Sequence, residues 1–344
     1  MSVTINVSGD LLWHDNLFQA ASEDAAALGE SGMNFAPMLA SAGAYAAEAD
    51  IGVCHEEVPF APEGGPYTGY PQFQAPPVIA KAIKELGWDI CTTASNHTVD
   101  AGWEGLARTV NTLRDAGLKT VGSYLTAEEA ETPTIVETAD GVKVAFISQT
   151  YGLNGLPIPA EQPWSVQLLD ADAAVQAARK AKEAGADIVA VHMHGGDEYV
   201  HEPNQQQLDY VQQVTASPDV DFVFGEHVHV VQPIDKVNGK WVVYGTGNLI
   251  AQSGPGQPYT YDGYMAQITF TGLKGQKFEA TAMEWAPTMI THYGYSPQAP
   301  ARVLVIPTEL ANGSEMAAEL EASAARTREI VNSLGVSGLT ERDH

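Results

Sequence analysis

The sequence predicts an α/β fold in one large domain, and three observations lead to this prediction. Apolar segments of strand length alternate with segments whose apolar residues recur at helical spacing. The chain has 344 residues, of which 44% are hydrophobic and 17% charged, which is enough for a sizeable folded core. Polar residues directly follow most of the apolar segments, and in open α/β sheets such positions gather at the carboxyl edge, where ligands bind.

The elements are expected in a regular order. The first strand covers residues 3–7 and ends at Ser8-Gly9-Asp10. Apolar runs predict further strands over 50–54, 88–93, 120–121, 142–148, 188–191, 220–224 and 240–244. Helical periodicity, closed in several places by glycine, predicts helices over 34–49, 78–86, 102–116, 171–184 and 205–216.

Two regions depart from this alternation. Residues 59–77 are rich in proline, glycine and aromatic residues, so we expect a long ordered loop there. The C-terminal part, residues 255–344, is expected to form antiparallel strands over 264–270, 278–285 and 302–306 and one closing helix over 309–334. Because no linker or internal repeat interrupts the sequence, residues 1–344 are expected to form a single domain.

The charge of the chain restricts its partners. There are 43 acidic and 17 basic residues, which gives a formal net charge of -26. Such a chain repels nucleic acid and anionic membranes, so neither is expected as a partner. An anionic substrate would need local positive charge, which bound metal ions can supply.

The sequence leaves the cellular compartment open. It has no apolar run of the roughly 18 residues that a membrane helix needs, and no basic and apolar leader at its start. We expect an extracellular or cell-envelope protein whose signal or anchor is absent from this chain; the alternative is a cytoplasmic protein. Cys54 and Cys91 both lie in apolar strands; in the first case they could either form a disulfide or remain two buried thiols, and in the second both should be free.

Potential metal ligands cluster where the predicted strands end. His227 and His229 directly follow the strand over 220–224, and neutral imidazole is a common ligand of Zn and Fe. The other residues in equivalent positions are Asp10, His55, Glu57, Asn96, His97, His192 and His194. Oxygen and nitrogen ligands without thiolate indicate two divalent cations such as Mn, Fe or Zn. A pair of such ions stabilises the attacking and leaving oxygens of a phosphoryl displacement.

Alternative roles exist for some of these residues. Asn96 could instead cap the helix that follows it. His192 lies two residues before His194 in a strand, so both side chains point to the same face, and one of them, His194, is expected to be the ligand.

Taken together, these residues resemble the motif set of the calcineurin-like metallophosphoesterases, namely Gly9-Asp10, Asn96-His97 and the Gly-x-His-x-His of 225–229. The chain is more closely similar to the CapA, or poly-γ-glutamate capsule synthesis, family. The segments that carry this resemblance occur in family order and are Cys54-His55-Glu56-Glu57-Val58-Pro59, the run from Ser95 to Gly102, His194-Gly195-Gly196-Asp197-Glu198-Tyr199 and Tyr244-Gly245-Thr246-Gly247-Asn248.

The resemblance implies a four-layer α/β/β/α sandwich of the metallophosphoesterase type, with a two-metal site at one edge. Asp10 and His229 would bind the first ion, and Asn96, His194 and His227 would bind the second. Glu57 would bridge the two ions. His97 would be the general acid, oriented by Asp100 three residues later.

The chain also departs from the family pattern. Asp10 is followed by two leucines, so the usual Asp-x-His is absent, and His14 would replace its histidine only if the loop curls back. His55 stands near a common family asparagine and would be a further ligand or support one. Gly195 stands where the family usually has an aromatic residue, so we expect open space beside the metal. The remaining supporting candidates are His192, Glu198 and Asn248.

Two functions follow from this resemblance. The first is a metal-dependent hydrolase of a small or polymeric anionic substrate, either a phosphoester or a polyglutamate-like polymer. The second is a non-catalytic accessory or binding component that joins the complex for capsule polymer synthesis or export. An uncoordinated histidine beside the ligands, His97, favours the hydrolase, because a purely structural metal site has no need of it.

Overall fold

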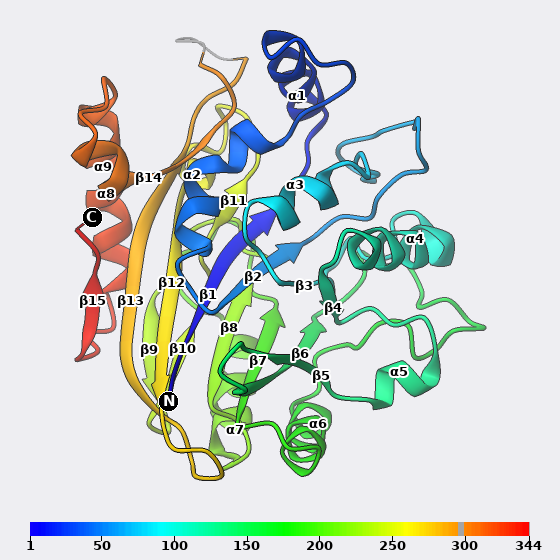
Figure 1. Ribbon diagram of the computed structural model, residues 1–344, viewed down its shortest axis with the longest axis vertical. Coiled ribbons are helices and arrows are strands. Elements are labelled where there is room, and N and C mark those ends of the chain that lie inside the picture. The colour runs from blue at the N-terminus through cyan, green and yellow to red at the C-terminus, as the bar shows by residue number, and fades with distance from the viewer. Residues whose placement is uncertain (295–298, 344) are drawn as a thin grey trace.

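Two β-sheets packed face to face form the centre of the computed structural model, which describes residues 1–294 and 299–343 (Figure 1). The first sheet has nine strands in this described part, in the order β14-β13-β12-β1-β2-β3-β4, with β11 paired to β1 and β15 to β13. Its strands are β1 (Ser2–Leu11), β2 (Ile51–Glu56), β3 (Ile90–Thr92), β4 (Lys119–Val121), β11 (Asn248–Ile250), β12 (Asp262–Thr271), β13 (Glu279–Ile290), β14 (Val303–Val305) and β15 (Leu339–Glu341).

The second sheet has six strands in the order β5-β6-β7-β8-β10-β9. They are β5 (Thr134–Glu137), β6 (Lys143–Thr150), β7 (Ile188–His194), β8 (Phe222–Glu226), β9 (Ile234–Val237) and β10 (Lys240–Val243). The neighbouring strands from β1 to β4, and from β6 through β8 to β10, run parallel. Parallel strands bring their carboxyl ends to a common edge, so residues that follow successive strands meet there.

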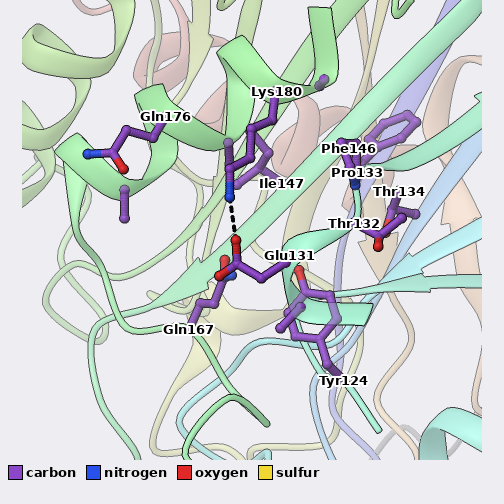
Figure 2. A pocket seen from close by; sticks show the side chains of 14 residues that line it. Tyr124, Glu131, Thr132, Pro133, Thr134, Phe146, Ile147, Gln167, Gln176 and Lys180 are labelled. Carbon is purple, nitrogen blue, oxygen red and sulfur yellow. Dashed lines mark hydrogen bonds and ion pairs between the residues drawn. The ribbon is translucent and has the colours of Figure 1, made fainter. Parts of the chain in front are cut away.

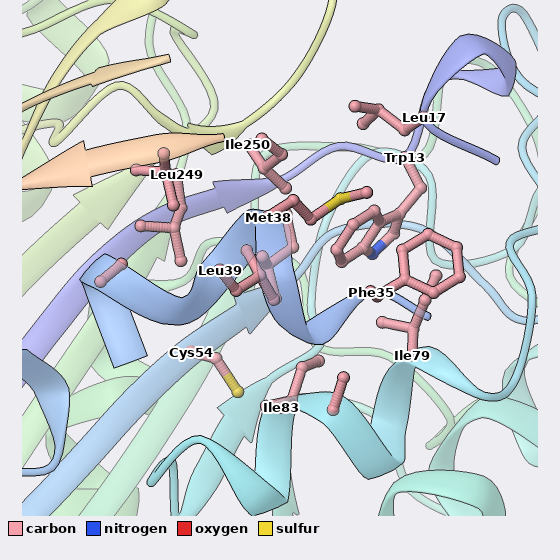
Figure 3. Close-up of a cluster of buried hydrophobic side chains, with 14 of the residues drawn as sticks. Trp13, Leu17, Phe35, Met38, Leu39, Cys54, Ile79, Ile83, Leu249 and Ile250 are labelled. Carbon is pink, nitrogen blue, oxygen red and sulfur yellow. The ribbon is translucent and has the colours of Figure 1, made fainter. Parts of the chain in front are cut away.

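Helices cover the outer face of each sheet. They are α1 (Asp15–Ala27), α2 (Ala36–Ala46), α3 (Ile79–Glu85), α4 (Gly102–Asp115), α5 (Ala127–Glu131), α6 (Ala171–Glu183), α7 (Gln205–Ala216), α8 (Ile306–Ala311) and α9 (Ala317–Val331). Apolar residues of α1, α2 and α3, among them Leu17, Met38 and Ile83, pack on the outer face of the first sheet (Figure 3). Alanines of α6 and apolar residues of α7 pack on the outer face of the second sheet.

The space between the sheets is filled by the inward side chains of both. Val3, Ile5 and Val7 of β1 meet Phe222 and Phe224 of β8 in this layer, at the alternate positions that a strand directs to one face. With helices outside each sheet, the molecule is a four-layer α/β/β/α sandwich, and the predicted fold class is confirmed.

The predicted elements are mostly confirmed, with one error. Residues 309–334 do not form a single helix, because α8 ends at Ala311 and α9 begins at Ala317. Gly313 lies between them with a φ of 75°, a conformation that a helix cannot continue through. The three predicted C-terminal strands, β12, β13 and β14, are antiparallel, as expected, and they extend the first sheet beside β1. The loop over 59–77 contains no helix or named strand. The short elements α5, β5, β9, β11 and β15 and the helix α1 were not predicted from the sequence.

A crevice with a volume of about 140 Å³ lies between the α5–β5 segment and α6 (Figure 2). Threonine and glutamine side chains line it, and an ion pair between Lys180 and Glu131 crosses it. It shares no residue with the cluster of metal-ligand types at the sheet edge.

Candidate metal centre

Five strands deliver the predicted ligands to one place. Asp10 lies near the end of β1, His55 and Glu57 at the end of β2, Asn96 after β3, His192 and His194 at the end of β7, and His227 and His229 just after β8. All of these side chains are buried. The convergence that the strand-end positions predicted is therefore present in the structure.

Close backbone contacts hold the ends of β1 and β8. A Cβ atom on Gly9 would lie 2.0 Å from the carbonyl oxygen of Gly247, and one on Gly225 would lie 2.3 Å from that of Tyr244. Only glycine fits at these two positions, which directly precede Asp10 and the Glu226-His227 segment. His227 and His229 themselves have positive φ values of 112° and 59°. Such strained backbone is typical of functional sites, where the surrounding structure holds it in place.

On one side of the cluster, His229 lies between two carboxylates. Its Nδ1 is 3.2 Å from Oδ2 of Asp10 and 2.9 Å from Oδ1 of Asn248, and its Nε2 is 3.7 Å from Oε1 of Glu57. Asn248 is fixed in turn, because its Nδ2 donates to the carbonyl oxygen of Thr260 at 3.1 Å. The structure therefore brings Asp10, Glu57 and His229 together, with Asn248 as the partner that orients the imidazole.

On the other side, Nε2 of His194 lies 2.7 Å from Oδ1 of Asn96 and 4.0 Å from Oε1 of Glu57. The ring of His227 lies 4.8 Å from the ring of His194, and His227, His229 and Glu57 offer ligand atoms within 4.8 Å of one another. Glu57 thus touches both sides of the cluster, as a bridging residue would.

Several buried polar atoms of this cluster have no hydrogen-bond partner. They are Oδ1 of Asp10, both carboxylate oxygens of Glu57, Nε2 of His55 and of His192, and Nδ1 of His194 and of His227. Leaving a buried polar atom unpaired costs about 1–3 kcal/mol, and more for a charged group. A concentration of such atoms in one place is what a metal centre requires, so the residues present fit bound divalent cations.

The protonation states of three of the histidines also fit metal ligation. Burial lowers the pKa of His55, His192 and His227 to about 3 in each case, so these imidazoles are neutral near pH 7. Burial raises the pKa of Glu57 well above its usual value, and the nearby Asp10 carboxylate raises it further. Burial alone would lower the pKa of His229, but Glu57 and Asp10 outweigh it and raise the pKa to about 10. Without a cation, the cluster therefore retains a proton on His229 at neutral pH.

His97 stands beside these residues without joining the carboxylate cluster. Its Nδ1 lies 2.7 Å from Oδ2 of Asp100, and its backbone N–H donates to Oγ of Ser95 at 3.0 Å. Ser95 also donates to the carbonyl oxygen of Glu57, which ties the turn after β3 to the end of β2. The alternative role of Asn96 as a helix cap is wrong, because α4 begins at Gly102 and has no side-chain cap.

The remaining candidates lie around the rim. His14 is half-buried, and its Nδ1 accepts a hydrogen bond from the backbone N–H of Gln252 at 3.2 Å. Its pKa is lowered to about 4, first by burial and then by His229. Glu198 is exposed. The expectation of open space at Gly195 is wrong, because a Cβ there would already lie 3.2 Å from Leu169 and 3.6 Å from Tyr151.

Two residues of the loop after β6 were missed by the sequence analysis. Oδ1 of Asn154 accepts a hydrogen bond from Nδ2 of Asn96 at 3.2 Å, which leaves Oδ1 of Asn96 directed at His194. The ring of Tyr151 lies 4.5 Å from that of His227. Asn154 does not follow a strand directly, and Tyr151 directly follows β6 only because that strand extends to Thr150, beyond the predicted end at residue 148. The one sequence signal was an asparagine before glycine, which is compatible with the positive φ of 52° that Asn154 adopts.

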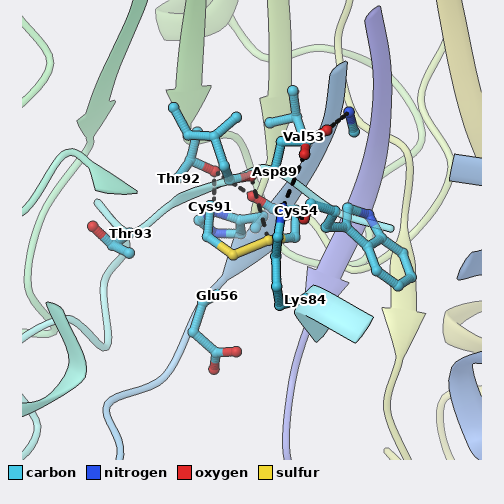
Figure 4. Close-up of a disulfide and its surroundings, with 12 residues drawn as sticks. Val53, Cys54, Glu56, Lys84, Asp89, Cys91, Thr92 and Thr93 are labelled. Carbon is cyan, nitrogen blue, oxygen red and sulfur yellow. Dashed lines mark hydrogen bonds and ion pairs between the residues drawn. A yellow bond between two sulfur atoms is a disulfide. The ribbon is translucent and has the colours of Figure 1, made fainter. Parts of the chain in front are cut away.

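A disulfide joins Cys54 of β2 to Cys91 of β3, directly behind these strand ends (Figure 4). The two residues are register partners in the parallel ladder, and their Cα atoms lie 4.5 Å apart. The bond therefore ties together the two strands that lead to Glu57 and Asn96.

Comparison with known proteins identifies the family. Residues 4–253 match the family described as "Bacterial capsule synthesis protein PGA_cap". The chain belongs to this family. The match covers every metal-ligand candidate from Asp10 to Asn248, and the predicted relationship to CapA proteins is confirmed.

Several relatives of this PGA_cap chain carry related names. It is 29% identical over 178 residues to the "Capsule biosynthesis protein CapA" of Bacillus anthracis, covering 51% of this chain and 43% of that protein. It is 26% identical over 205 residues to the "PGA biosynthesis protein CapA" of Bacillus subtilis, covering 59% and 53%. A "Probable polyglutamine synthesis accessory protein" of Mycobacterium tuberculosis is 26% identical over 178 residues, covering 49% and 47%. The matched region thus spans about half the length of these relatives.

Solved structures support the fold of the PGA_cap chain. A phosphatase from Mycoplasma pneumoniae superposes with a TM-score of 0.53 at 11% identity, over 87% of this chain and 98% of that one. A candidate 5′-nucleotidase of Staphylococcus aureus superposes with a TM-score of 0.51 at 15% identity, over 86% and 56%. At this level of identity the likeness shows the fold, which is that of the metallophosphoesterases. None of the helices in the described part of the chain has the length and apolar character needed to cross a membrane.

Proposed function

We propose that this PGA_cap protein is a metal-dependent hydrolase of the phosphoesterase type that acts in the synthesis of a capsule or cell-envelope polymer. One observation carries the proposal. Buried, unpaired ligand atoms surround Glu57, and a histidine held by a carboxylate, His97 with Asp100, stands beside them. A centre that only stabilised the fold would not need the second feature.

The residues divide into two ligand sets around one carboxylate. Asp10 and His229 would hold one ion, and Asn96, His194 and His227 would hold the other, with Glu57 shared between them. The set of carboxylate, amide and imidazole ligands suits Mn, Fe or Zn. When bound, such a pair supplies an activated water and neutralises the charge that develops on the group being transferred.

His97 would donate the proton that the leaving oxygen needs. The Asp100 carboxylate accepts a hydrogen bond from Nδ1–H of the imidazolium, which fixes the ring and leaves Nε2–H as the proton to be delivered. The edge of the Phe73 ring meets the imidazole at a centroid distance of 4.8 Å and limits its rotation.

The charge distribution supports an anionic substrate that is recognised through the cations. The sequence contains no Lys or Arg within residues 1–80, 85–107, 144–178, 183–235 or 241–273, which include every loop that supplies a candidate ligand. No Lys or Arg side chain from these loops could bind a phosphate or a carboxylate. The names of the relatives support a substrate linked to the poly-γ-glutamate capsule, either a small phosphoester or the polymer itself.

A second function is favoured by one comparison. The mycobacterial relative is named as an accessory protein of polymer synthesis. In that role the chain would use its metal centre to bind the polymer, or a partner in the synthesis complex, without hydrolysis. For either role the disulfide supports an extracellular or cell-envelope location, because such bonds persist in oxidising compartments.

One experiment separates the two functions. Metal-free protein is reloaded with Mn, Fe or Zn and assayed against phosphomonoesters, phosphodiesters and γ-glutamyl peptides, with His97→Ala as a matched control. Turnover that needs the metal and falls in His97→Ala supports the hydrolase. Metal-loaded protein that binds polyglutamate without turning over any of these substrates would establish the accessory role.

A further inference from the structure

Three histidines form a second cluster beside the ligand sets described above. His55 comes from the end of β2, and His192 and His194 come from the end of β7. The ring of His55 lies 4.6 Å from that of His192 and 4.8 Å from that of His194. One ligand nitrogen from each ring lies within 4.8 Å of the other two, and all three residues are buried.

Each of the three rings is held through one nitrogen and free at the other. Nδ1 of His55 lies 2.8 Å from Oγ1 of Thr92, and Nδ1 of His192 lies 2.9 Å from Oγ of Ser148. Nε2 of His194 lies 2.7 Å from Oδ1 of Asn96. The opposite nitrogens, Nε2 of His55, Nε2 of His192 and Nδ1 of His194, are buried and have no partner. Metal-binding histidines show this pattern, in which a hydrogen bond at one nitrogen orients the ring and directs the other to the ion.

We propose that His55, His192 and His194 hold a further divalent cation next to the two-ion centre. Three imidazoles without a carboxylate favour Zn, Cu or Ni over Mg, Ca or Mn. Three protein ligands would leave one position open, as in zinc sites that accept water or substrate. Oδ1 of Asp10, also unpaired, lies 3.7 Å from Nε2 of His55 and provides negative charge beside this site.

His194 links the new site to the proposed pair. Its Nε2 faces Asn96 and Glu57, and its Nδ1 is free, so the ring could bind one ion at each nitrogen once its N–H proton is released to solvent. His192 belongs to the new site alone. It contacts Ser148 and the Phe224 ring, and it has no contact with Asp10, Glu57 or His229 among the interactions of the described residues. His192 is therefore the residue that tests the proposal.

The test counts ions and does not depend on catalysis. Metal-free wild type, His192→Gln and His201→Gln are each saturated with Zn²⁺, freed of excess metal and analysed for zinc per chain. His201 is a matched control, because it is a half-buried histidine whose Nδ1 bonds to the carbonyl oxygen of Val231, outside the cluster. We expect His192→Gln to retain one zinc fewer than wild type, and His201→Gln to match wild type. Saturation with Mn²⁺ is expected to give equal counts in all three proteins.

Equal zinc counts in wild type and His192→Gln would overturn the proposal. If His192→Gln fails to fold, Ser148→Ala leaves the ring in place and removes only its anchor. Loss of this supporting hydrogen bond is expected to lower the zinc affinity of the site formed by His55, His192 and His194 by about 10–100-fold. Zinc affinity in Ser148→Ala that is unchanged at every site would equally overturn the proposal. Since no substrate is used, an inactive protein that still binds the additional zinc would refute the hydrolase and leave this site intact.

Discussion

Nδ1 of His97 lies 2.7 Å from Oδ2 of Asp100, and the same oxygen accepts a hydrogen bond from the backbone N–H of Phe73 at 2.9 Å. The carboxylate is therefore fixed by the long loop after β2 and fixes the imidazole in turn. We expect His97→Ala to lower turnover by about 10²–10⁴ while both ions stay bound, because a positioned acid contributes about that much to rate. Steady-state kinetics with parallel elemental analysis measures this.

The matched control is His229→Ala, which removes a proposed metal ligand. Unlike His97→Ala, it should lose bound metal. The turnover of Asp100→Asn should lie between that of wild type and that of His97→Ala, since the variant keeps the shape of the side chain and loses its charge. Full activity in His97→Ala would show that another group supplies the proton.

The amide of Asn154 orients that of Asn96, and its removal should weaken metal binding. Asn154 has a φ of 52°, so Asn154→Gly deletes the side chain and leaves the backbone unstrained. We expect the affinity for one ion to fall by about 10–100-fold, the usual effect of losing a partner that orients a ligand. Isothermal titration calorimetry resolves the change.

Asn238→Gly is the control for this variant, because Asn238 also has a φ of 52° and lies in the turn between β9 and β10. Equal metal affinities in Asn154→Gly and Asn238→Gly would show that Asn154 does not orient a metal ligand.

Metal uptake should release protons, because His229 is protonated in the ion-free protein. Its pKa is raised to about 10 against a usual 6.5, since Glu57 and Asp10 outweigh the opposing effect of burial. The imidazole must lose this proton before it can bind a cation, so metal affinity should rise with pH up to about 10. At pH 7 we expect at least one proton to leave per chain, because Glu57, whose pKa is also raised, must likewise be ionised to bind the cations. Titrations in buffers of different ionisation enthalpy measure the number, and a binding enthalpy that is the same in every buffer would contradict it.

The disulfide should contribute substantially to stability. It closes a loop over a sequence separation of 37, for which loop-closure entropy gives about 3–4 kcal/mol. The double variant Cys54→Ala/Cys91→Ala of this 344-residue chain is therefore expected to unfold roughly 4–6 °C below wild type. Thermal unfolding with and without a thiol reductant measures this. Reductant should lower the midpoint of wild type and leave that of the double variant unchanged; equal midpoints for both proteins would show that the bond adds nothing.

The strand-end ligands could be predicted because their signal is local. An apolar run followed within three residues by Asp10, Glu57 or His194 places each of them near a strand terminus. Parallel pairing then brings these strand ends to one edge of a sheet. The four-layer arrangement could not be predicted from the residue pattern alone. It came from the family resemblance, since periodicity alone does not say which sheet faces which.

The parts that could not be predicted depend on long-range contacts. Asn96 and Asn154 are 58 residues apart, and no local sequence pattern at either residue indicates their hydrogen bond. The space beside Gly195 depends on Tyr151 and Leu169, which approach from another loop. The break at Gly313 was missed for a different reason: an isolated glycine inside a helical pattern can be tolerated, and the φ of 75° that ends the helix there is visible only in the structure.

The Cys54–Cys91 bond also links metal loading to the redox state of a preparation. Past the bond, each strand leads to its own part of the proposed centre, Glu57 after β2 and Asn96 after β3. Without the bond, three register pairs and hydrogen bonds such as that from Ser95 to the carbonyl oxygen of Glu57 still join these segments. A newly made chain whose thiols are reduced therefore holds these donors less firmly. We expect thiol oxidation to favour metal loading, so the redox history of a preparation should influence how much of it becomes holoprotein.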